Sequence, residues 1–508
     1  MSIFLKNQRT SGILAHFTSL PSDFGIGDIG RGAETFLIFL QQAGQKYWQI
    51  LPTGPTSLIF DSSPYMSTSA FAGSPLLICP HLLKKMGFIQ TITNRPETFS
   101  PYTTDFLSVT AFKSQLLQRA FQNFSDQQDD QFDKFTSSTR WLHDYASFMT
   151  LKTIYQNKAW YEWPEKFVKR DPKALAGLPQ QYPELFNYFL FEQYVFSRQW
   201  LHLREQAADR DIKLIGDIPI YVSLDSADVW ANQDIFELHA HTRRPVRVSG
   251  VPPDYFSKTG QRWGNPLYRW NSKDRIIKAT LLDWWENRFR ETFRLVDAAR
   301  IDHFRGFESY WAVPEKSKNA IDGSWVKGPG VNLFRQLKKR LGPLNIIAED
   351  LGEITPAVIN LRKELDFPGM KVLQFAFDGD PSNSFLPFNF DTDHCVVYTG
   401  THDNNTTVGW FLSDIPDEQA RAYVKQCCNR ELHDNRGIHE DLLYLSMSSI
   451  AKLAITPLQD ILGFGGDCRM NTPGVPSGNW KWRCAPENLG KECAEYLKSM
   501  TILTGRLG

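Results

Sequence analysis

Eight short apolar runs, several of them followed by a helix-like stretch, most constrain the fold of this 508-residue chain. Continuous apolar runs of this length are typical of parallel strands that are buried on both faces. Parallel strands need long crossover connections, which helices usually supply. The candidate strands are residues 12–17, 46–51, 212–218, 297–302, 345–349, 372–377, 395–399 and 460–464.

One stretch in the second half of the chain shows the alternation of helix and strand well. A predicted helix with basic residues near its end is stopped by Gly342-Pro343, and a later one begins with Thr355-Pro356 as N-cap and first helical residue. The order is helix 333–341, strand 345–348, helix 357–365 and strand 372–377. Eight strands in such units favour an α/β fold of the (β/α)₈ TIM-barrel type over an open doubly wound sheet.

The spacing of the candidate strands is uneven. About 160 residues separate the second strand from the third, far more than one helical connection needs. We interpret residues 81–199 as a mainly helical insertion over the C-terminal face of the barrel, which itself comprises residues 1–80 and 200–508. The alternative is that this stretch is an independent second domain.

Composition narrows the classes of partner. Lys plus Arg and Asp plus Glu both number 56, so the formal net charge is zero, which argues against a nucleic-acid partner. No apolar run approaches the roughly 20 residues of a membrane helix, and residues 1–6 lack the apolar core of a signal peptide. The seven cysteines include no CxxC pair, which favours reduced thiols. We therefore expect a cytoplasmic protein with no membrane partner.

Two further motif classes are discounted. Residues 25–30 match GxGxxG, but a loop separates them from the preceding strand and no acidic residue lies near 48–51, so a tight loop is favoured over a dinucleotide site. The histidines and cysteines show no metal-ligand spacing. We expect neither a metal nor another cofactor.

Acidic residues stand where several candidate strands end. Arg300 and Asp302 are two positions apart and therefore share one face of a strand, which indicates that this strand reaches the open mouth of the barrel. Glu349 ends the next candidate strand, Asp403 follows a later one, and Asp217 ends an earlier one. Arg300 is expected to keep Asp302 ionised, because a nearby opposite charge lowers the pKa of a carboxyl group.

Carboxylates that converge on one pocket repel each other, and such an arrangement is typical of a site that uses them. A retaining glycosidic mechanism needs one ionised carboxylate that attacks the sugar and a second, protonated one that serves the leaving oxygen. The structural alternative is that each acid forms a separate ion pair or helix cap.

At these residues the chain closely resembles the amylomaltase, or disproportionating enzyme, family, the α-glucan 4-glucanotransferases of the α-amylase clan. The resemblance extends through nearly the whole chain. The matching blocks are residues 18–21 with 25–28, 63–65 with 69–73, 216–222, 250–256, 260–266, 300–307, 348–352, 401–404 and 469–474. Departures are Asp467-Cys468, where the family usually has Glu-Ala, and residues 56–62, which lack the expected glycines.

The resemblance implies a transfer of α-1,4-glucan segments from a donor to the 4-hydroxyl of an acceptor glucan or glucose. It makes Asp302 the nucleophile, Glu349 the general acid/base and Asp403 the residue that stabilises the transition state. It also implies malto-oligosaccharides as donor and acceptor, and no C-terminal β-sandwich. The substrate contacts that it implies are Arg300, His402, Asp217, His303, Tyr65, Asp254, Tyr255 and Trp263.

Two alternatives in function remain at this point. The first is an α-1,4-glucan hydrolase with the same three carboxylates. The second is a non-catalytic glucan-binding barrel, which would most simply lack one of the three, whereas all are present.

Overall fold

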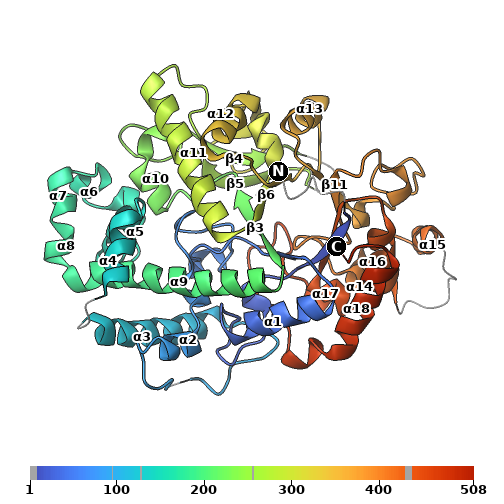
Figure 1. Cartoon of the computed structure of the whole chain (residues 1–508). Helices are drawn as coiled ribbons and strands as arrows, with labels where there is room; N and C mark the ends of the chain where they lie inside the picture. The colour runs from blue at the N-terminus through green and yellow to red at the C-terminus, as the bar shows by residue number, and fades with distance from the viewer. Residues whose placement is uncertain (1–7, 94, 126–128, 254–256, 429–436, 508) are drawn as a thin grey trace.

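The computed structural model describes residues 8–93, 95–125, 129–253, 257–428 and 437–507. Its centre is an eight-stranded parallel sheet (Figure 1). The strands are β1 (Thr10–Leu14), β2 (Tyr47–Gln49), β3 (Lys213–Pro219), β6 (Ala298–Asp302), β9 (Ile346–Ala348), β10 (Gly369–Val372), β11 (Cys395–Tyr398) and β12 (Leu453–Pro457).

The sheet closes on itself. β1 pairs in parallel with both β2 and β12, so the first strand lies beside the last. The remaining neighbours follow chain order, and the Ala348 N–H at the end of β9 donates to the Pro368 carbonyl just before β10, at 2.9 Å. The chain is therefore a (β/α)₈ barrel, as the alternation of apolar runs and helices predicted.

Seven of the eight predicted strands overlap an observed one, but the eighth prediction is wrong. Residues 460–464 lie in helix α17 (Leu458–Ile461) and the turn after it, whereas the strand is β12, seven residues earlier. Both stretches are short and apolar, and periodicity alone does not separate a buried strand from a buried helical turn. The predicted strand 372–377 is also shifted, since β10 ends at Val372 and a 3₁₀ turn follows.

Helices cover the outside of the barrel (Figure 1). Those that connect consecutive strands are α1 (Arg31–Gln42), α9 (Pro183–Asp209), α11 (Arg275–Leu295), α12 (Val331–Leu341), α13 (Pro356–Leu365), α15 (Glu418–Cys427) and α16 (Ile438–Ser448), and α18 (Lys491–Leu503) follows β12. α12 buries Leu333, Phe334 and Leu337 against the barrel and stops at Gly342, whose φ of 83° is in the region that favours glycine.

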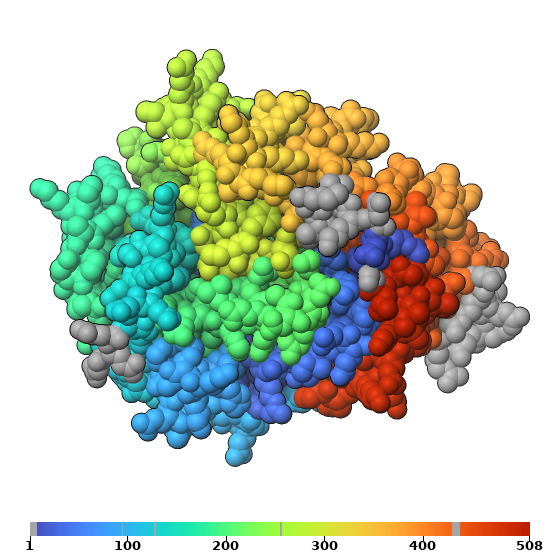
Figure 2. Space-filling view, viewed as in Figure 1, coloured from blue at the N-terminus to red at the C-terminus, as the bar shows by residue number. Residues whose placement is uncertain are grey.

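The two ends of the barrel sequence meet in space. In Figure 2 the red C-terminal segment lies beside the blue N-terminal segment. The fully buried Arg506 donates to the carbonyls of Thr10, Met447 and Ser449, and so joins the last residues of the chain to β1. After Arg483 the described residues form a short 3₁₀ turn and α18.

The long stretch between β2 and β3 is mainly helical. The helices before α9 are α2 (Pro80–Lys85), α3 (Phe106–Ser125), α4 (Asp130–Ser138), α5 (Leu142–Ile154), α6 (Glu165–Val168), α7 (Pro172–Ala176) and α8 (Leu178–Gln181). Phe148 of α5 and Trp163, just before α6, contact Trp230 in the connection after β3, whereas α3 and α4 contact α9. The last helix of the stretch, α9, returns along the barrel, and its Trp200 donates to the Leu295 carbonyl at the end of α11.

A second, antiparallel sheet was not predicted. It has the strand order β5-β4-β7-β8 and arises from the connections after β3 and after β6. Its strands are β4 (Arg247–Val251), β5 (Gln261–Pro266), β7 (Ser309–Pro314) and β8 (Ser324–Lys327). Connections at the C-terminal ends of barrel strands carry the active site in this fold, so this sheet borders the candidate site.

The GxGxxG-like segment is a packed loop, as the sequence analysis favoured. Asp28 accepts from the Gly30 N–H and pairs with Lys113 of α3 at 3.1 Å, with both side chains buried. A Cβ on Gly27 would lie 1.9 Å from the Phe17 carbonyl oxygen, which explains the glycine there. The described part of the chain holds no disulfide and no helix long and apolar enough to cross a membrane.

Candidate active site

The register of two neighbouring strands places the first group of polar residues. β3 and β6 pair so that Asp217 lies opposite Arg300 and Pro219 opposite Asp302. Arg300 donates from Nη2 to Asp217 Oδ2 at 2.7 Å and to Asp302 Oδ1 at 2.9 Å. The side chain of Asp217 is fully buried, whereas that of Asp302 is 32% exposed. Asp302 therefore faces the open mouth of the barrel, and Asp217 fixes the guanidinium behind it.

Glu349 stands on the next strand of the barrel. β6 and β9 pair with Ile301 opposite Ala348, so the residue after each, Asp302 and Glu349, follows at the same level. The Glu349 carboxyl accepts from the backbone N–H groups of His303 at 2.7 Å and Leu351 at 2.9 Å. His303 adopts the left-handed conformation, with φ at 53°, and its N–H meets the Glu349 carboxyl there. Two acids from adjacent strands thus border one opening.

The third predicted acid, Asp403, follows β11. Asn471 donates to its Oδ1 at 2.6 Å, and Arg469 donates to its backbone carbonyl at 2.6 Å. His402 Nε2 lies 3.3 Å from the same Oδ1, and the Asp403 side chain is 45% exposed. Asp403 is therefore fixed by a late loop but open to the pocket.

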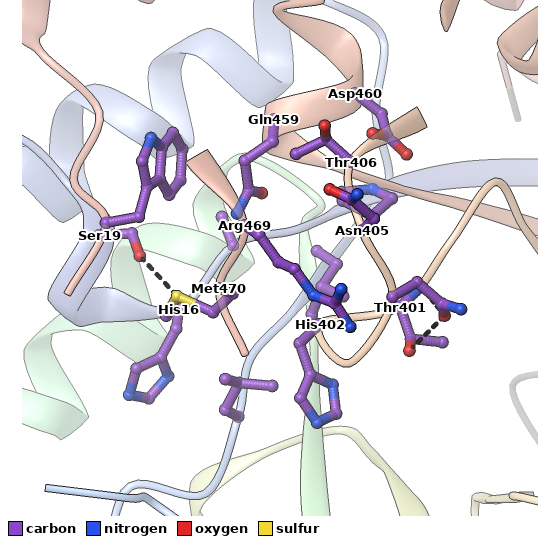
Figure 3. A pocket seen from close by; sticks show the side chains of 16 residues that line it. His16, Ser19, Thr401, His402, Asn405, Thr406, Gln459, Asp460, Arg469 and Met470 are labelled. Atoms are coloured by element: carbon purple, nitrogen blue, oxygen red, sulfur yellow. Dashed lines mark hydrogen bonds between the residues drawn. The ribbon is translucent and has the colours of Figure 1, made fainter. Parts of the chain in front are cut away.

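Tyr65 connects Asp217 on β3 with His402, next to Asp403. Its hydroxyl donates to Asp217 Oδ2 at 2.7 Å and lies 2.8 Å from His402 Nε2, and its ring stacks on the His402 ring with centroids 5.2 Å apart. Figure 3 shows His402 among the side chains that line a pocket, together with Arg469, His16 and Thr401. The residues from β3, β6 and β11 thus form one connected network.

Of the predicted substrate contacts not yet placed, the structure describes Trp263, which lies next to His303. Trp263 on β5 packs edge-on against His303, with ring centroids 4.8 Å apart. Asp350 lies outside the network, where it accepts from the Met370 N–H and pairs with Arg362 at 2.9 Å. The predicted contacts Asp254 and Tyr255 lie outside the described residues.

Burial and mutual repulsion dominate the electrostatics of the site. Burial raises the pKa of Asp302 to about 8, Arg300 lowers it, and the carboxylates of Asp217, Glu349 and Asp403 add to the rise. Arg300 therefore acts in the predicted direction but is outweighed. Burial also raises the pKa of Glu349, and it lowers the pKa of His402, which favours a neutral imidazole. Asp302 and Glu349 therefore keep their protons to a higher pH than exposed acids do.

The raised pKa of Asp302, caused first by burial and then by the neighbouring carboxylates, predicts how the stability of the fold changes with pH. The pKa of Asp302 is about 8 in the folded protein, against about 3.9 for an unfolded aspartate. The charged form therefore destabilises the fold, increasingly as the pH rises from about 4 to about 8. We expect Asp302→Asn to raise the thermal unfolding midpoint at pH 8, with a gain that shrinks toward pH 4. Calorimetry at both pH values checks this, and a midpoint at pH 8 equal to or below that of the unsubstituted protein would contradict it.

Sequence reasoning assigned no role to three residues of this network. Asn471 and Arg469 hold Asp403, and Trp480 lies against the rings of Tyr65 and His402 at 5.8 and 6.1 Å. The only sequence signal was that two of them fall in the block 469–474, which resembles the family but ends no strand.

A (β/α)₈ barrel with an acid on each of two adjacent strand ends, beside a buried guanidinium, has the arrangement that barrel enzymes acting on glycosidic bonds require. Comparison with known proteins identifies the member of that class. A family model described as 4-alpha-glucanotransferase matches residues 15–488, and the chain belongs to this family. It is accordingly a glucan-transferring enzyme.

Individual relatives agree over almost their full length. The chain is 47% identical to the 4-alpha-glucanotransferase of Synechocystis, over 98% of each protein, and 43% identical to that of Thermus thermophilus, over 98% of this chain and 99% of the relative. A solved amylomaltase from Streptococcus agalactiae, in complex with acarbose, superposes with a TM-score of 0.93 at 38% identity, over 98% of this chain and all of that one.

Proposed function

We propose that the chain moves an α-1,4-glucan segment from a donor malto-oligosaccharide to the 4-hydroxyl of an acceptor glucan or glucose, by a retaining double displacement. The observation that carries this proposal is the placement of Asp302 and Glu349 on adjacent strands at one opening, with Arg300 bonded to Asp302. Two acids across a single sugar are the arrangement that retention of configuration requires.

The reaction proceeds in two halves. Glu349 gives its proton to the glycosidic oxygen while Asp302 attacks the anomeric carbon, which forms a β-glucosyl ester and releases the leaving glucan. Glu349, now a base, takes the proton of the incoming 4-hydroxyl, and that oxygen displaces Asp302 to form a new α-1,4 bond. One bond breaks and a like bond forms, so the balance needs no co-reactant. Asp302 attacks in its ionised form, which the N–H bond from Arg300 stabilises against the burial and the neighbouring carboxylates that raise its pKa.

The donor sugar is held from the other side of the mouth. Arg300, His402 and the half-exposed Asp403 present charged and polar groups there. Asp217 acts differently, because its side chain is fully buried and bonded to Arg300 and Tyr65. We therefore assign Asp217 a positioning role in place of the direct sugar contact that the resemblance implies. His303 and Trp263 line the side of Glu349.

Transfer must outcompete hydrolysis, since water is always present. An acceptor held in attack geometry reaches effective molarities of about 10⁵ M or more, which exceeds the concentration of water. We expect incubation with maltotriose to yield longer and shorter glucans while the total of reducing ends stays constant. A reducing-sugar assay beside chromatography checks this. A steady rise in reducing ends would instead establish the hydrolase alternative.

Two features of organisation belong to the proposal. Residues 81–199 form a helical subdomain beside the mouth of a barrel made by residues 1–80 and 200–508, as the packing of Trp163 and Phe148 on Trp230 supports. The working compartment is the cytoplasm, which the small number of cysteines and their lack of CxxC spacing support.

A further inference from the structure

An exposed tryptophan lies on the antiparallel sheet beside the active site. Trp325 on β8 is 40% exposed, although tryptophan is a residue that folded proteins mostly bury. Its ring contacts two groups. The Arg305 guanidinium lies 3.8 Å from the ring centroid, and the Trp311 ring meets it nearly at right angles, with centroids 5.1 Å apart. Arg305 and Trp311 therefore hold the Trp325 ring at the surface, where part of it contacts solvent.

Both neighbours are rigidly held. Arg305 is 6% exposed, and its guanidinium donates to the Glu353 carbonyl. The Trp311 indole N–H donates to the Ala320 carbonyl at 2.8 Å, and Trp311 pairs directly with Trp325 in the register of β7 and β8. A preorganised ring loses little conformational entropy when it binds a ligand, which distinguishes it from a mobile surface side chain.

The Trp325 ring lies on the side of the active site that carries Glu349, the proposed acid/base. Arg305 follows Asp302 by three residues, and Glu353, whose carbonyl it contacts, follows Glu349 by four. The groups proposed to hold the donor sugar, His402 and Asp403, come from β11 on another side of the barrel. Because Glu349 serves the leaving and incoming glucans, a ring on its side lies toward the acceptor.

The hairpin that carries the ring is also joined to the neighbouring one. The Ala320 N–H, in the turn between β7 and β8, donates to the Thr259 carbonyl, in the connection between β4 and β5, at 3.0 Å. The Trp263 ring on β5 in turn packs against His303, next to the nucleophile. A continuous set of elements therefore runs from the reacting carboxylates to Trp325.

We propose that Trp325, stacked on Arg305, is an outer acceptor subsite that binds a glucose unit of a long acceptor chain, away from the bond that forms. The flat face of a pyranose presents C–H groups that pack on an aromatic ring, and its rim hydroxyls remain in water. This inference rests on the proposed function, because it assumes glucan acceptors. A single glucose is too short to reach such a subsite, so we expect the enzyme to prefer long acceptors over glucose.

The test compares acceptors of two lengths. With one fixed donor, we expect Trp325→Ala to lower kcat/KM for maltotetraose or longer acceptors about tenfold and to leave glucose within about twofold. Trp325→Phe keeps a ring and should lose less. Tyr444→Ala, which removes a ring that is 49% exposed on α16, is the matched control and should change neither value.

Each other outcome is decisive. An equal loss for glucose and for maltotetraose would mean that Trp325 only supports the fold, and no loss for either would mean that the ring binds nothing; both overturn the subsite. If Trp325→Ala does not fold, the length dependence of Trp325→Phe decides alone. Failure of the unsubstituted protein to transfer glucan at all would instead overturn the proposed function.

Discussion

Replacing Asp302 by alanine is expected to lower the turnover of maltotriose by about 10⁴-fold or more, because no other group can form the covalent intermediate. Asp302 is the only carboxylate on β6 that faces the mouth of the barrel, and Arg300 orients it at 2.9 Å. Initial rates of product formation measure the loss. The matched control is Asp297→Asn, at the other end of the same chain segment and bonded to Arg204, which should keep the rate within a few-fold.

A small anion should restore part of this reaction and reveal the side of attack. Azide can enter the space that the Asp302 side chain leaves and displace fluoride from an α-maltosyl fluoride donor. We expect the product of Asp302→Ala to be the β-azide, because azide then attacks from the face that Asp302 occupied. The anomer is read by nuclear magnetic resonance. An α-azide, or rates close to those of the unsubstituted enzyme, would remove Asp302 from the nucleophile role.

Replacing Glu349 by glutamine is expected to have a large effect that depends on the donor. With maltotriose, general acid catalysis contributes about 10²–10⁴-fold, and that factor should be lost. With α-maltosyl fluoride, fluoride leaves without a proton, so the first half-reaction should persist. Glutamine can accept from only one of the N–H groups of His303 and Leu351, because the two donate to different oxygens of Glu349 and an amide has a single acceptor oxygen. The second half-reaction lacks its base, so a glycosylated enzyme should accumulate.

Intact-protein mass spectrometry measures that accumulation directly. The same donor with the unsubstituted enzyme provides the control, since the intermediate there is consumed by acceptors. Equal slowing on maltotriose and on the fluoride, with no added mass, would indicate that Glu349 supports the fold or binds sugar and does not transfer the proton.

The parts of the site that lie at strand ends were predictable from sequence. The period of two in a strand places Arg300 and Asp302 on one face, and the switch from apolar to charged residues marks the mouth of the barrel. Parallel register then brings Glu349 beside Asp302. The barrel followed from the same apolar runs, although the last strand was placed seven residues too late because two similar runs lie close together.

Other parts depend on contacts that local patterns do not encode. Asn471 reaches Asp403 across 68 positions of the chain, from a loop with no strand or helix signal. The left-handed conformation of His303 follows from its surroundings, since histidine has no strong local preference for it. The sequence predicted that the other carboxylates would converge on Asp302 and repel it, but it did not predict the burial that chiefly raises the pKa of Asp302 and outweighs Arg300. The antiparallel sheet was not predicted because its strands contain Gly250 and Pro266, and both residue types are typical of loops.

The identity of the residue that becomes esterified tests the central claim most directly. The species that Glu349→Gln accumulates with α-maltosyl fluoride can be digested at low pH, and the peptide with the added maltosyl mass can be sequenced by tandem mass spectrometry. The account predicts a single modified residue, Asp302. A label on Asp403, on Asp217 or on any other residue would contradict it.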